Sequence, residues 1–471
     1  MKRTIIMAWR NIWRNKRRTL ITIASIFFAV FFAVLMRSFQ IGTYDHMIHQ
    51  AIESYSGYIQ IQNKDYFDEP SLDNSVPYNT ELISQLNQIE NIKVAVPRIE
   101  SFALASTGNQ SKGVIVTGID PLKEEFLSNP QNRIVKYRFT PETVKRIIEE
   151  TNLSDKQKEL INSVENQSYS SLSRISLDLK LTKAQEKEVF PVIEKHASFQ
   201  GEYLDLSDDG ILISDRLSKY LDAHVGDTII LMGGGYHGRS ATGLFPVKGI
   251  VKILSPDLDN KLVYMTLNKA QEFYSMEDRI TTLNINLNDP DEMLKTQGNI
   301  KTLIASDLYS VKNWEEFNPT LKQQIEGDSV GGVIFIGILY FIVFFGIIGT
   351  VLMMIAERKR ELGVMVAVGM PKLRLSFVLV IEMLFLGFIG MISGLVASTP
   401  LIVLGNKNPW RMTGEMAKMY EDMGFEAVMP LAWFDPYFFW QGVIVMIMVL
   451  LACYLPLRRV RRMNVIHSLR A

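Results

Sequence analysis

The 471-residue sequence lacks the residues on which several classes of protein depend. It contains one cysteine, Cys453, which excludes a disulfide framework, and six scattered histidines, which give no metal-binding signature. His46 and His49 are spaced to share one face of a helix, but two ligands without a third do not make a metal site. The sequence therefore predicts no metal bound by this chain.

Nucleotide-binding and catalytic patterns are absent as well. No G-x-x-x-x-G-K-[ST] motif occurs, and the glycine-rich stretch GGGYHG (233–238) is followed by a second strand-like run instead of a helix. We interpret that stretch as a glycine hairpin. No cluster of nucleophile, base and orienting residue supports an enzyme, so we predict a non-enzyme. If ATP powers this protein, ATP and Mg²⁺ bind to another chain.

Four uncharged or nearly uncharged runs are long enough to cross a bilayer, which needs about 20 residues. They are 20–37, 330–356, 375–404 and 437–457, and only the third contains an acidic residue, Glu382. No small-x-small cleavage site follows the first run, so we interpret it as an uncleaved membrane anchor.

The chain also has no net charge, because its 50 Lys and Arg residues balance its 50 Asp and Glu residues. The segments 1–19, 357–374 and 458–471 nevertheless contain 17 basic residues and only two acidic ones, Glu357 and Glu361. The positive-inside rule places all three segments in the cytoplasm. The remaining 33 basic and 48 acidic residues then lie mostly on the outside. We predict a helical membrane domain of four transmembrane helices with cytoplasmic termini.

Residues 38–329 form the predicted extracytoplasmic domain, between the first and second membrane helices. Runs such as YIQIQ (58–62), DTIILM (227–232) and TLNINL (282–287) alternate or are β-branched, which predicts strands. Helical patterns occur as well, so the fold class is α+β. A shorter extracytoplasmic loop, 405–436, joins the third and fourth membrane helices.

The stretch 121–200 interrupts this domain. It is rich in Lys, Glu, Gln and Ser, and Thr140, Ser154 and Thr182 each precede a helical pattern as candidate N-caps. We interpret 121–200 as a helical insertion.

The cytoplasmic segment 357–374, ERKRELGVMVAVGMPKLR, begins with charges and continues with small apolar residues until Pro371. Such a helix suits docking into a cleft on a partner protein. It equally suits an interfacial helix whose charges only enforce topology, and the residues by themselves favour neither.

The sequence ERKRELGVMVAVGMPKLRLSFVLVIEMLFLGFIGMISG resembles the region that defines the FtsX/LolC/MacB-type permeases of type VII ABC transporters. The resemblance rests on ten positions: Glu357, Arg358, Glu361, Gly363, Ala367, Gly369, Glu382, Gly387, Gly390 and Gly394. The ends of the chain resemble the same family: 1–19 its amphipathic N-terminal helix and 458–471 its C-terminal tail, with Asn464 where proline is usual. Several outer-domain segments are similar to lipoprotein-releasing permeases in particular, but 121–200 is not.

The resemblance implies roles for some of these residues. Segment 357–374 is the family's coupling helix, in which Glu357, Arg358, Glu361, Gly363 and Gly369 contact the ATPase subunit or shape the contact. Glu382, a charge inside a membrane helix, has three possible roles: pairing near the inner surface with Arg374 or with headgroups, coupling, or ion relay. We expect Gly387, Gly390 and Gly394 to pack this helix against the fourth or the second membrane helix.

Phenylalanines crowd the first two membrane helices. They are lipid-facing or packed aromatics, or they line the cavity that receives acyl chains in lipoprotein-releasing relatives. The candidate cavity residues are Phe28, Phe31, Phe32, Phe335, Phe341 and Phe345.

The resemblance implies a permease subunit in the bacterial inner membrane, with a cytoplasmic ABC ATPase dimer and a second copy or a paralogous permease as partners. The expected function is release of lipoproteins to a periplasmic carrier, in contact with membrane lipid and without nucleic acid. The alternatives are a mechanotransmitter that activates a periplasmic cell-wall hydrolase, and export of peptides or drugs.

Overall fold

A computed structural model describes residues 2–304, 307–412, 414–422, 427–434 and 436–461. Asn464 and most of the predicted tail 458–471 lie outside the described residues. The chain divides into two compact units. The helical unit comprises the described residues of 1–46, 322–412 and 428–471, and the α+β unit comprises those of 47–321 and 413–427.

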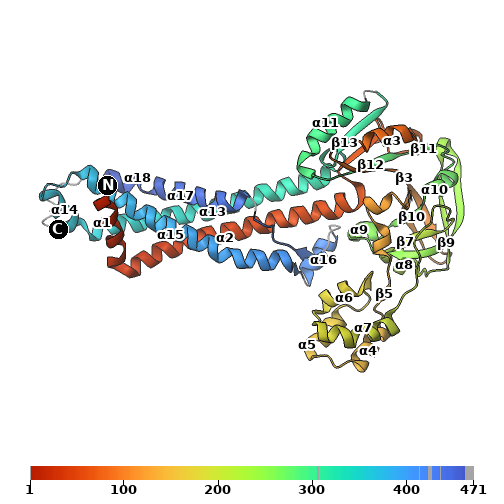
Figure 1. The fold of residues 1–471 in the computed structure, drawn as a ribbon, viewed down its shortest axis with the longest axis horizontal. Helices are drawn as coiled ribbons and strands as arrows, with labels where there is room; N and C mark the ends of the chain where they lie inside the picture. Colours follow the sequence, from red (N-terminus) through yellow and green to blue (C-terminus); the bar gives the residue numbers. More distant parts are fainter. Residues whose placement is uncertain (1, 305–306, 413, 423–426, 435, 462–471) are drawn as a thin grey trace. The chain divides into compact units, whose positions relative to one another are not determined.

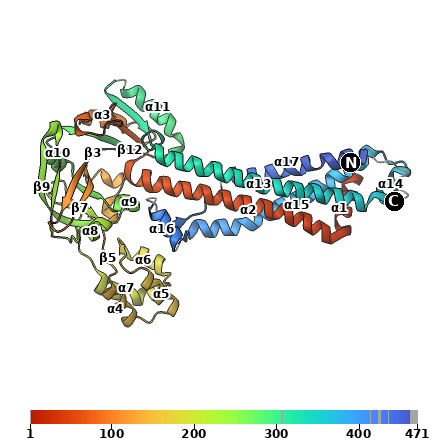
Figure 2. The same cartoon turned by 180° about the vertical axis from the view of Figure 1, so that it is seen from behind.

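Helices form almost all of the helical unit (Figures 1 and 2). In chain order they are α1 (Lys2–Ile12), η1 (Trp13–Asn15), α2 (Lys16–Ile48), α13 (Pro319–Glu357), α14 (Lys359–Ala367), α15 (Lys372–Lys407), α17 (Pro436–Ala452) and α18 (Tyr454–Arg461). A two-stranded ribbon, β14 (Trp410–Arg411) with β15 (Val428–Met429), lies between α15 and α17 in the sequence.

Three helices of the described chain are long and apolar enough to cross a membrane: the run that contains α2, then α13 and α15. The fourth predicted span, 437–457, is divided between α17 and α18. The division follows from Pro456, which has no N–H to donate to the carbonyl of Ala452. α17 is apolar but has only 17 residues, so a count of four membrane helices stays a prediction.

Glycines of α15 bring two neighbouring helices close. A Cβ atom added at Gly387 would lie 3.2 Å from Val449 of α17, whereas one added at Gly394 would lie 2.9 Å from the carbonyl oxygen of Phe27 on α2. A Cβ atom added at Gly390 would lie 2.8 Å from the side chain of Ile26 on α2. We expected Gly390 and Gly394 to pack against the fourth or the second predicted membrane helix. That prediction was wrong, because both glycines pack against α2, the first apolar helix.

Gly394→Leu is expected to destabilise the helical unit by about 1–3 kcal/mol, because the new side chain must displace the backbone of α2. The measurement is thermal unfolding of the purified chain in detergent. Gly346→Leu on α13 is the matched control, since a Cβ atom there meets nothing within 4 Å. Equal stability of the two variants would contradict the tight α2–α15 contact.

The α+β unit is built on a nine-stranded sheet, in the order β13-β1-β12-β3-β4-β10-β7-β9-β8. The strands are β1 (Ile59–Asn63), β3 (Ile92–Ser106), β4 (Ser111–Ile119), β7 (Ile211–Ser214), β8 (Thr228–Gly234), β9 (Ser240–Val251), β10 (Leu262–Thr266), β12 (Thr282–Leu287) and β13 (Tyr309–Asn313). Because β3 also pairs with β8, six of these strands close into a barrel. β12, β1 and β13 extend from β3 as an open sheet.

Short helices accompany this sheet. They are α3 (Thr80–Leu86), α8 (Asp215–Leu221), α9 (Pro256–Asp259), α10 (Leu267–Tyr274), α11 (Met293–Ile304), α12 (Trp314–Phe317) and α16 (Glu415–Asp422). A small pair, β2 (Val76–Pro77) with β11 (Arg279–Ile280), lies outside the main sheet. α16 contacts α9, so part of the predicted loop 405–436 belongs to the α+β unit.

An α+β domain joined to apolar helices is what the sequence predicted, and the individual strand predictions differ in accuracy. YIQIQ, DTIILM and TLNINL form β1, β8 and β12, and GGGYHG lies in the β8–β9 hairpin, as interpreted. The longest strand, β3, was missed because Pro97 and charged residues interrupt its pattern. Pro97 is tolerated because the pairing of β3 with β4 begins only at Arg98.

The stretch predicted as an insertion contains α4 (Pro141–Glu150), α5 (Asp155–Ser163), α6 (Leu172–Leu179), α7 (Lys183–Ala197) and the pair β5 (Tyr137–Arg138) with β6 (Ser168–Tyr169). The three predicted N-caps are confirmed. Thr140 accepts a hydrogen bond from the N–H of Thr143, and Ser154 and Thr182 form capping boxes with residues three positions on. These helices share a hydrophobic core of their own, which includes Phe139, Ile147 and Ile193.

Asp215, at the start of α8, connects the inserted stretch 121–200 to the barrel through hydrogen bonds and ion pairs. Its buried carboxylate accepts hydrogen bonds from Ser168 at 2.7 Å and from Arg138 at 2.9 Å, both from the inserted stretch. Lys219 and Lys252 lie at 2.7 and 3.5 Å. Burial by itself would raise the pKa of Asp215, but Lys252 and Lys219 outweigh it and hold the pKa below its usual value.

We therefore expect the attachment of the inserted helices to weaken at low pH, when Asp215 becomes protonated. A carboxyl group with a lowered folded-state pKa stabilises above its unfolded pKa, about 4, and loses this contribution as the pH falls further. We expect Asp215→Asn to cost roughly 2 kcal/mol at pH 7 and much less at pH 3. Thermal unfolding at both pH values measures this, and a loss that is equal at pH 7 and pH 3 would contradict it.

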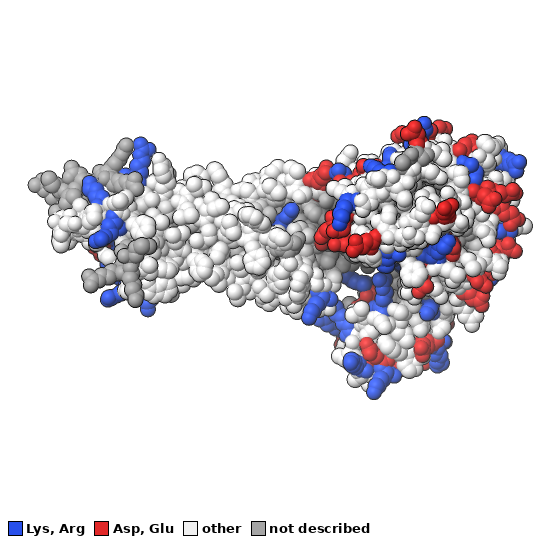
Figure 3. Space-filling model, turned by 45° about the horizontal axis from the view of Figure 1, so that its top comes forward, with Lys and Arg blue, Asp and Glu red and all other residues white. Residues whose placement is uncertain are grey.

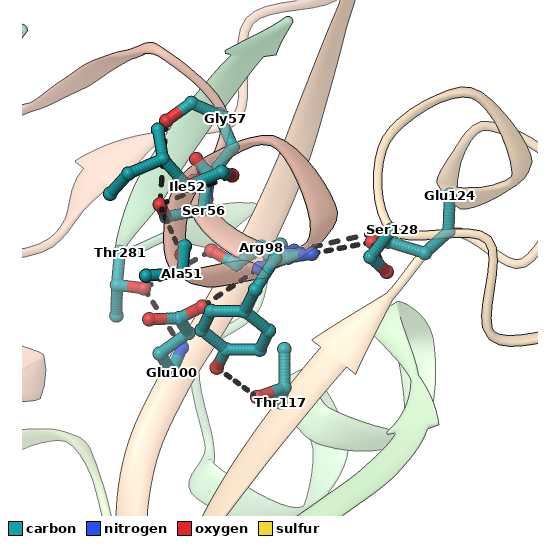
Figure 4. A network of polar contacts seen from close by, with 12 residues as sticks. Ala51, Ile52, Ser56, Gly57, Arg98, Glu100, Thr117, Glu124, Ser128 and Thr281 are labelled. Atoms are coloured by element: carbon teal, nitrogen blue, oxygen red, sulfur yellow. Dashed lines mark hydrogen bonds and ion pairs between the residues drawn. The ribbon is translucent and has the colours of Figure 1, made fainter. Parts of the chain in front are cut away.

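A second buried charge, Arg98, lies on β3 within a network of polar contacts (Figure 4). The fully buried Arg98 donates to the fully buried Glu124 and, at 3.1 Å, to the partly exposed Glu100. Its guanidinium lies 4.8 Å from the ring centre of Tyr55, which belongs to η2 (His49–Ser56), a π-helix. Ser128 also donates to Glu124. The cluster joins β3, η2 and the loop after β4.

Candidate functional site

The segment 357–374 contains a short helix, α14, set between two long ones. α13 ends at Glu357, Arg358 is the N-cap of α14, and Pro371 is the N-cap of α15. Gly369, two residues beyond the end of α14, has a φ of +102°, a backbone conformation that other residues rarely adopt. Gly369 therefore shapes this segment through its backbone, whereas Gly363 is buried within α14.

Arg358 connects α14 to α15 and, indirectly, to α1. Its Nη1 lies 3.0 Å from Oε2 of Glu382, and the Nδ2 of Asn11 donates to Oε1 of Glu382 at 2.6 Å. The Glu382 side chain is only 2% exposed, so both of its partners are needed to replace the water that it loses. Trp9 of α1 contacts Phe385 edge to face, with ring centres 5.4 Å apart.

Of the partners considered for Glu382, Arg374 is not the one that the structure shows. The two residues are eight positions apart on one helix, which is about 12 Å along its axis. Arg374 is exposed, and the partner of Glu382 comes from α14 instead. Of the three roles considered for Glu382, an ion pair with a neighbouring residue is therefore the one that the geometry shows.

The two acidic residues of the segment pair with basic residues that begin the chain. Glu361 accepts a hydrogen bond from Arg14 and lies 3.4 Å from Arg358. The hydrogen bond from Arg14 lowers the pKa of Glu361. Arg18 donates to Glu357 at 2.7 Å and to the carbonyl of Thr350 at 2.8 Å.

These contacts define the inner network: Asn11, Arg14, Arg18, Glu357, Arg358, Glu361 and Glu382. The charged residues expected to contact or shape a partner thus pair within their own chain. Glu361 joins α14 to η1, Arg358 joins it to α15, and Glu357 joins the end of α13 to α2. Arg360, Val364 and Val368 remain exposed, and Val368 is 83% exposed. Sequence reasoning missed both valines and the N-terminal partners, although their spacing of four residues places the valines on one helix face.

The candidate cavity phenylalanines are not gathered into one cluster. Phe28 stacks on Phe32 within α2, and Phe341 contacts Phe345 within α13. Five of the six are at least half exposed and Phe31 is partly exposed, and among the described residues no ring of one helix contacts a ring of the other. A cavity lining stays a prediction for these residues.

Among the described residues no group of three or more His, Cys, Asp or Glu is arranged to hold a metal ion. The inner network has a structural effect on α14. Its ion pairs hold the short helix α14 against η1 and the buried start of α15.

Residues 333–465 match the family model described as FtsX-like permease C-terminal. The chain is 20% identical over 245 residues to the lipoprotein-releasing system transmembrane protein LolC of Neisseria meningitidis, which covers 51% of this chain and 57% of LolC. It is 25% identical over 158 residues to an uncharacterized ABC transporter permease, MJ1507, of Methanocaldococcus jannaschii, covering 32% and 39% of the two chains. The chain thus spans about half the length of these relatives, or less.

One solved structure that the chain matches is the periplasmic region of MacB from Actinobacillus actinomycetemcomitans. It is 13% identical, covers 60% of this chain and 98% of its own, and has a TM-score of 0.31.

Proposed function

Because the chain belongs to the FtsX/LolC/MacB-type family of ABC transporter permeases, we propose that it is the permease subunit of an ATP-driven complex that extracts lipoproteins from the outer leaflet of the bacterial inner membrane. A periplasmic carrier then receives the lipoprotein. The match to a lipoprotein-releasing protein over 245 residues supports this substrate class. In this proposal four helices span the membrane, the α+β unit is periplasmic and both termini are cytoplasmic.

A separate dimeric ATPase binds ATP and Mg²⁺ in the cytoplasm and docks on the exposed face of α14, formed by Arg360, Val364 and Val368. ATPase closure pushes α14, and the inner network passes the movement to the long helices. A second copy of the chain or a paralogous permease completes the pathway. The exposed phenylalanines of α2 and α13 contact acyl chains on that pathway.

The inserted helices favour a second candidate function. They have their own core and a polar attachment at Asp215, which suits an arm that holds a periplasmic partner. In that case the same movement activates a cell-wall hydrolase, and no lipoprotein is extracted. Export of peptides or drugs is the remaining alternative, and no specific contact favours it.

The test is gentle purification of the full chain from its native membrane, followed by mass spectrometry of all bound molecules. An ATPase, a second permease and lipoproteins together support release. An ATPase with a wall hydrolase and no lipoprotein supports the second candidate, and a chain without any ATPase overturns both.

A double variant makes the same experiment specific for α14. Val364→Glu with Val368→Glu is expected to reduce the co-purified ATPase by about tenfold or more, because charges would be buried at the centre of the contact. Leu177→Glu is the control, since Leu177 is 72% exposed on α6, in the other unit of the chain. An unchanged amount of ATPase in the double variant would exclude α14 as the docking face.

A further inference from the structure

The strand β13 is the open edge of the nine-stranded sheet. At the other end of the strand order, β8 pairs back onto β3, so that end has no free edge. β13 pairs with β1 on one side, and no described strand pairs with its other side. An open edge presents unpaired N–H and C=O groups, to which a further strand can add.

The antiparallel register determines which backbone groups of β13 face this open edge. The N–H of Trp314 donates to the carbonyl of Tyr58 at 2.9 Å, at the end of the β1–β13 pairing. Hydrogen-bonded residues alternate along an antiparallel pair, so the even-numbered residues of β13 bond to β1. The odd-numbered residues therefore turn their backbone groups to the open edge: Tyr309, Val311 and Asn313.

Two of these outward backbone groups have partners within the chain. The carbonyl of Val311 accepts a hydrogen bond from Gln297 of α11 at 2.9 Å, and the N–H of Asn313 donates to Glu316 at 2.9 Å. Among the described residues, none accepts a hydrogen bond from the N–H of Tyr309 or of Val311 at this edge. Those two donors lie on alternate residues, which is the spacing at which an added strand pairs.

A groove lies beside this edge. It encloses about 500 Å³ and is lined by Lys301 and Ile304 of α11, by 309–312 of β13 and by Glu316 of α12. α11 contacts β13, and the two elements lie side by side in Figure 1. A strand that added to β13 would occupy this groove and would contact α11 as well.

The side chains of the groove favour an acidic occupant. Lys301 is exposed, and none of the described residues forms an ion pair with it or with Lys312. The ammonium group of Lys312 lies 3.4 Å from the ring centre of Phe67. Glu316 accepts a hydrogen bond from Gln297 at 2.7 Å instead of pairing with either lysine. Both lysines are therefore available to a carboxylate from outside the chain.

These two lysines also distinguish an acidic partner from a second copy of the chain. Outside its three basic segments the chain has 33 basic and 48 acidic residues, and Figure 3 shows several groups of Asp and Glu on the α+β unit. Two copies that shared the β13 edge would bring two positively charged grooves together, and like charges opposite one another destabilise a strand pair. An acidic segment meets no such repulsion.

We propose that β13 binds an extended acidic segment of another protein, which adds to the sheet as a further strand beside β13 and α11. Backbone hydrogen bonds to Tyr309 and Val311 supply affinity, and carboxylates on Lys301 and Lys312 select the partner. The strand site is additional to the proposed function, which places this groove in the periplasm.

The test uses the full chain in phosphatidylcholine nanodiscs and a fluorescein-labelled heptapeptide of alternating valine and glutamate. Fluorescence anisotropy measures binding. The same peptide with lysine in place of glutamate, and the glutamate peptide with N-methyl groups on every backbone nitrogen, should each bind about tenfold more weakly or less. Hydrogen exchange of the amides at 309–311 should slow with the unmodified glutamate peptide.

Two variants of the chain separate the hydrogen bonds from the charges. Tyr309→Pro removes one edge N–H and leaves the pairing with β1 in place, so the glutamate peptide should bind about fivefold more weakly. Lys301→Glu with Lys312→Glu should weaken its binding by about tenfold. Lys295→Glu is the matched control, since Lys295 is an exposed lysine of α11 that does not line the groove, and it should leave binding unchanged.

Equal binding of the N-methylated peptide, or equal binding of the glutamate and lysine peptides, overturns the inference, and both comparisons use the unaltered chain. Failure of every peptide to bind also overturns it, and identifies Lys312 as an edge residue that only prevents strand addition. A dimer of the chain that Tyr309→Pro dissociates would assign the edge to a second copy instead. None of these measurements requires an ATPase or a lipoprotein, so their outcome is independent of the proposed function.

Discussion

Arg98→Met is expected to lower the free energy of unfolding of the α+β unit by about 3–5 kcal/mol, the cost of leaving a buried charge without its partner. Glu124 is fully buried, and without Arg98 its carboxylate loses its ion pair and keeps the hydrogen bond from Ser128. Burial by itself would lower the pKa of Arg98, but Glu124 and Glu100 raise the pKa above its usual value, so the charge is always present. Glu100 is partly exposed and can be solvated.

A double variant separates the charge from the packing. Arg98→Met with Glu124→Gln removes both charges at nearly constant volume and should recover a large part of the loss. Chemical denaturation of the full chain, followed by hydrogen exchange in β3, measures both effects. Lys295→Met is the control, because Lys295 and Glu292 form an exposed pair that contributes little. A double variant as unstable as the single one would show that packing of the arginine, and not its charge, is what stabilises the unit.

Arg358→Met should release α14 from the helical unit. The buried Glu382 side chain of α15 would keep Asn11 as its hydrogen-bond partner among the described residues, and the expected cost is again about 3–5 kcal/mol. Hydrogen exchange of α14 and α1 in detergent should accelerate together, because both helices depend on Glu382. In the proposed function, the same variant would lose ATPase-driven movement even where the ATPase still binds.

Two comparisons sharpen this prediction. Arg360→Met changes a neighbouring exposed arginine, and it should leave exchange in both helices unchanged. Arg14→Met should have a small effect, since Arg14 and Glu361 are both about half exposed and such pairs contribute little. If Arg358→Met left exchange in α1 at its original rate, the inner network would not connect the two helices.

The sequence was informative wherever the determining interactions are local. Caps at Thr140, Ser154 and Thr182 act within one helical turn, so the residues themselves predict where those helices begin. Long uncharged runs likewise predict apolar helices, because the bilayer requires a length that composition reveals. The family pattern at 357–394 identified the segment that contains α14, and with it most of the inner network.

Tertiary structure decided which residues meet. Glu382 could have paired with any nearby cation, and only the turn at α14 brings Arg358 to it instead of Arg374. Gly390 and Gly394 predict close packing, but a glycine has no side chain with which to specify its partner, and the fold selects α2. β3 was missed because its neighbours β4, β8 and β12 supply the pairing that its own interrupted pattern does not indicate.

By itself, then, the sequence determined the apolar helices, the local caps and the α+β character of the larger unit. Only the folded chain placed Asn11, Arg14 and Arg18 against a segment more than 300 residues away. The physical reason is that periodicity and capping are properties of neighbouring residues. An ion pair between distant segments depends on how every intervening helix and strand packs, and that information is spread over the whole chain.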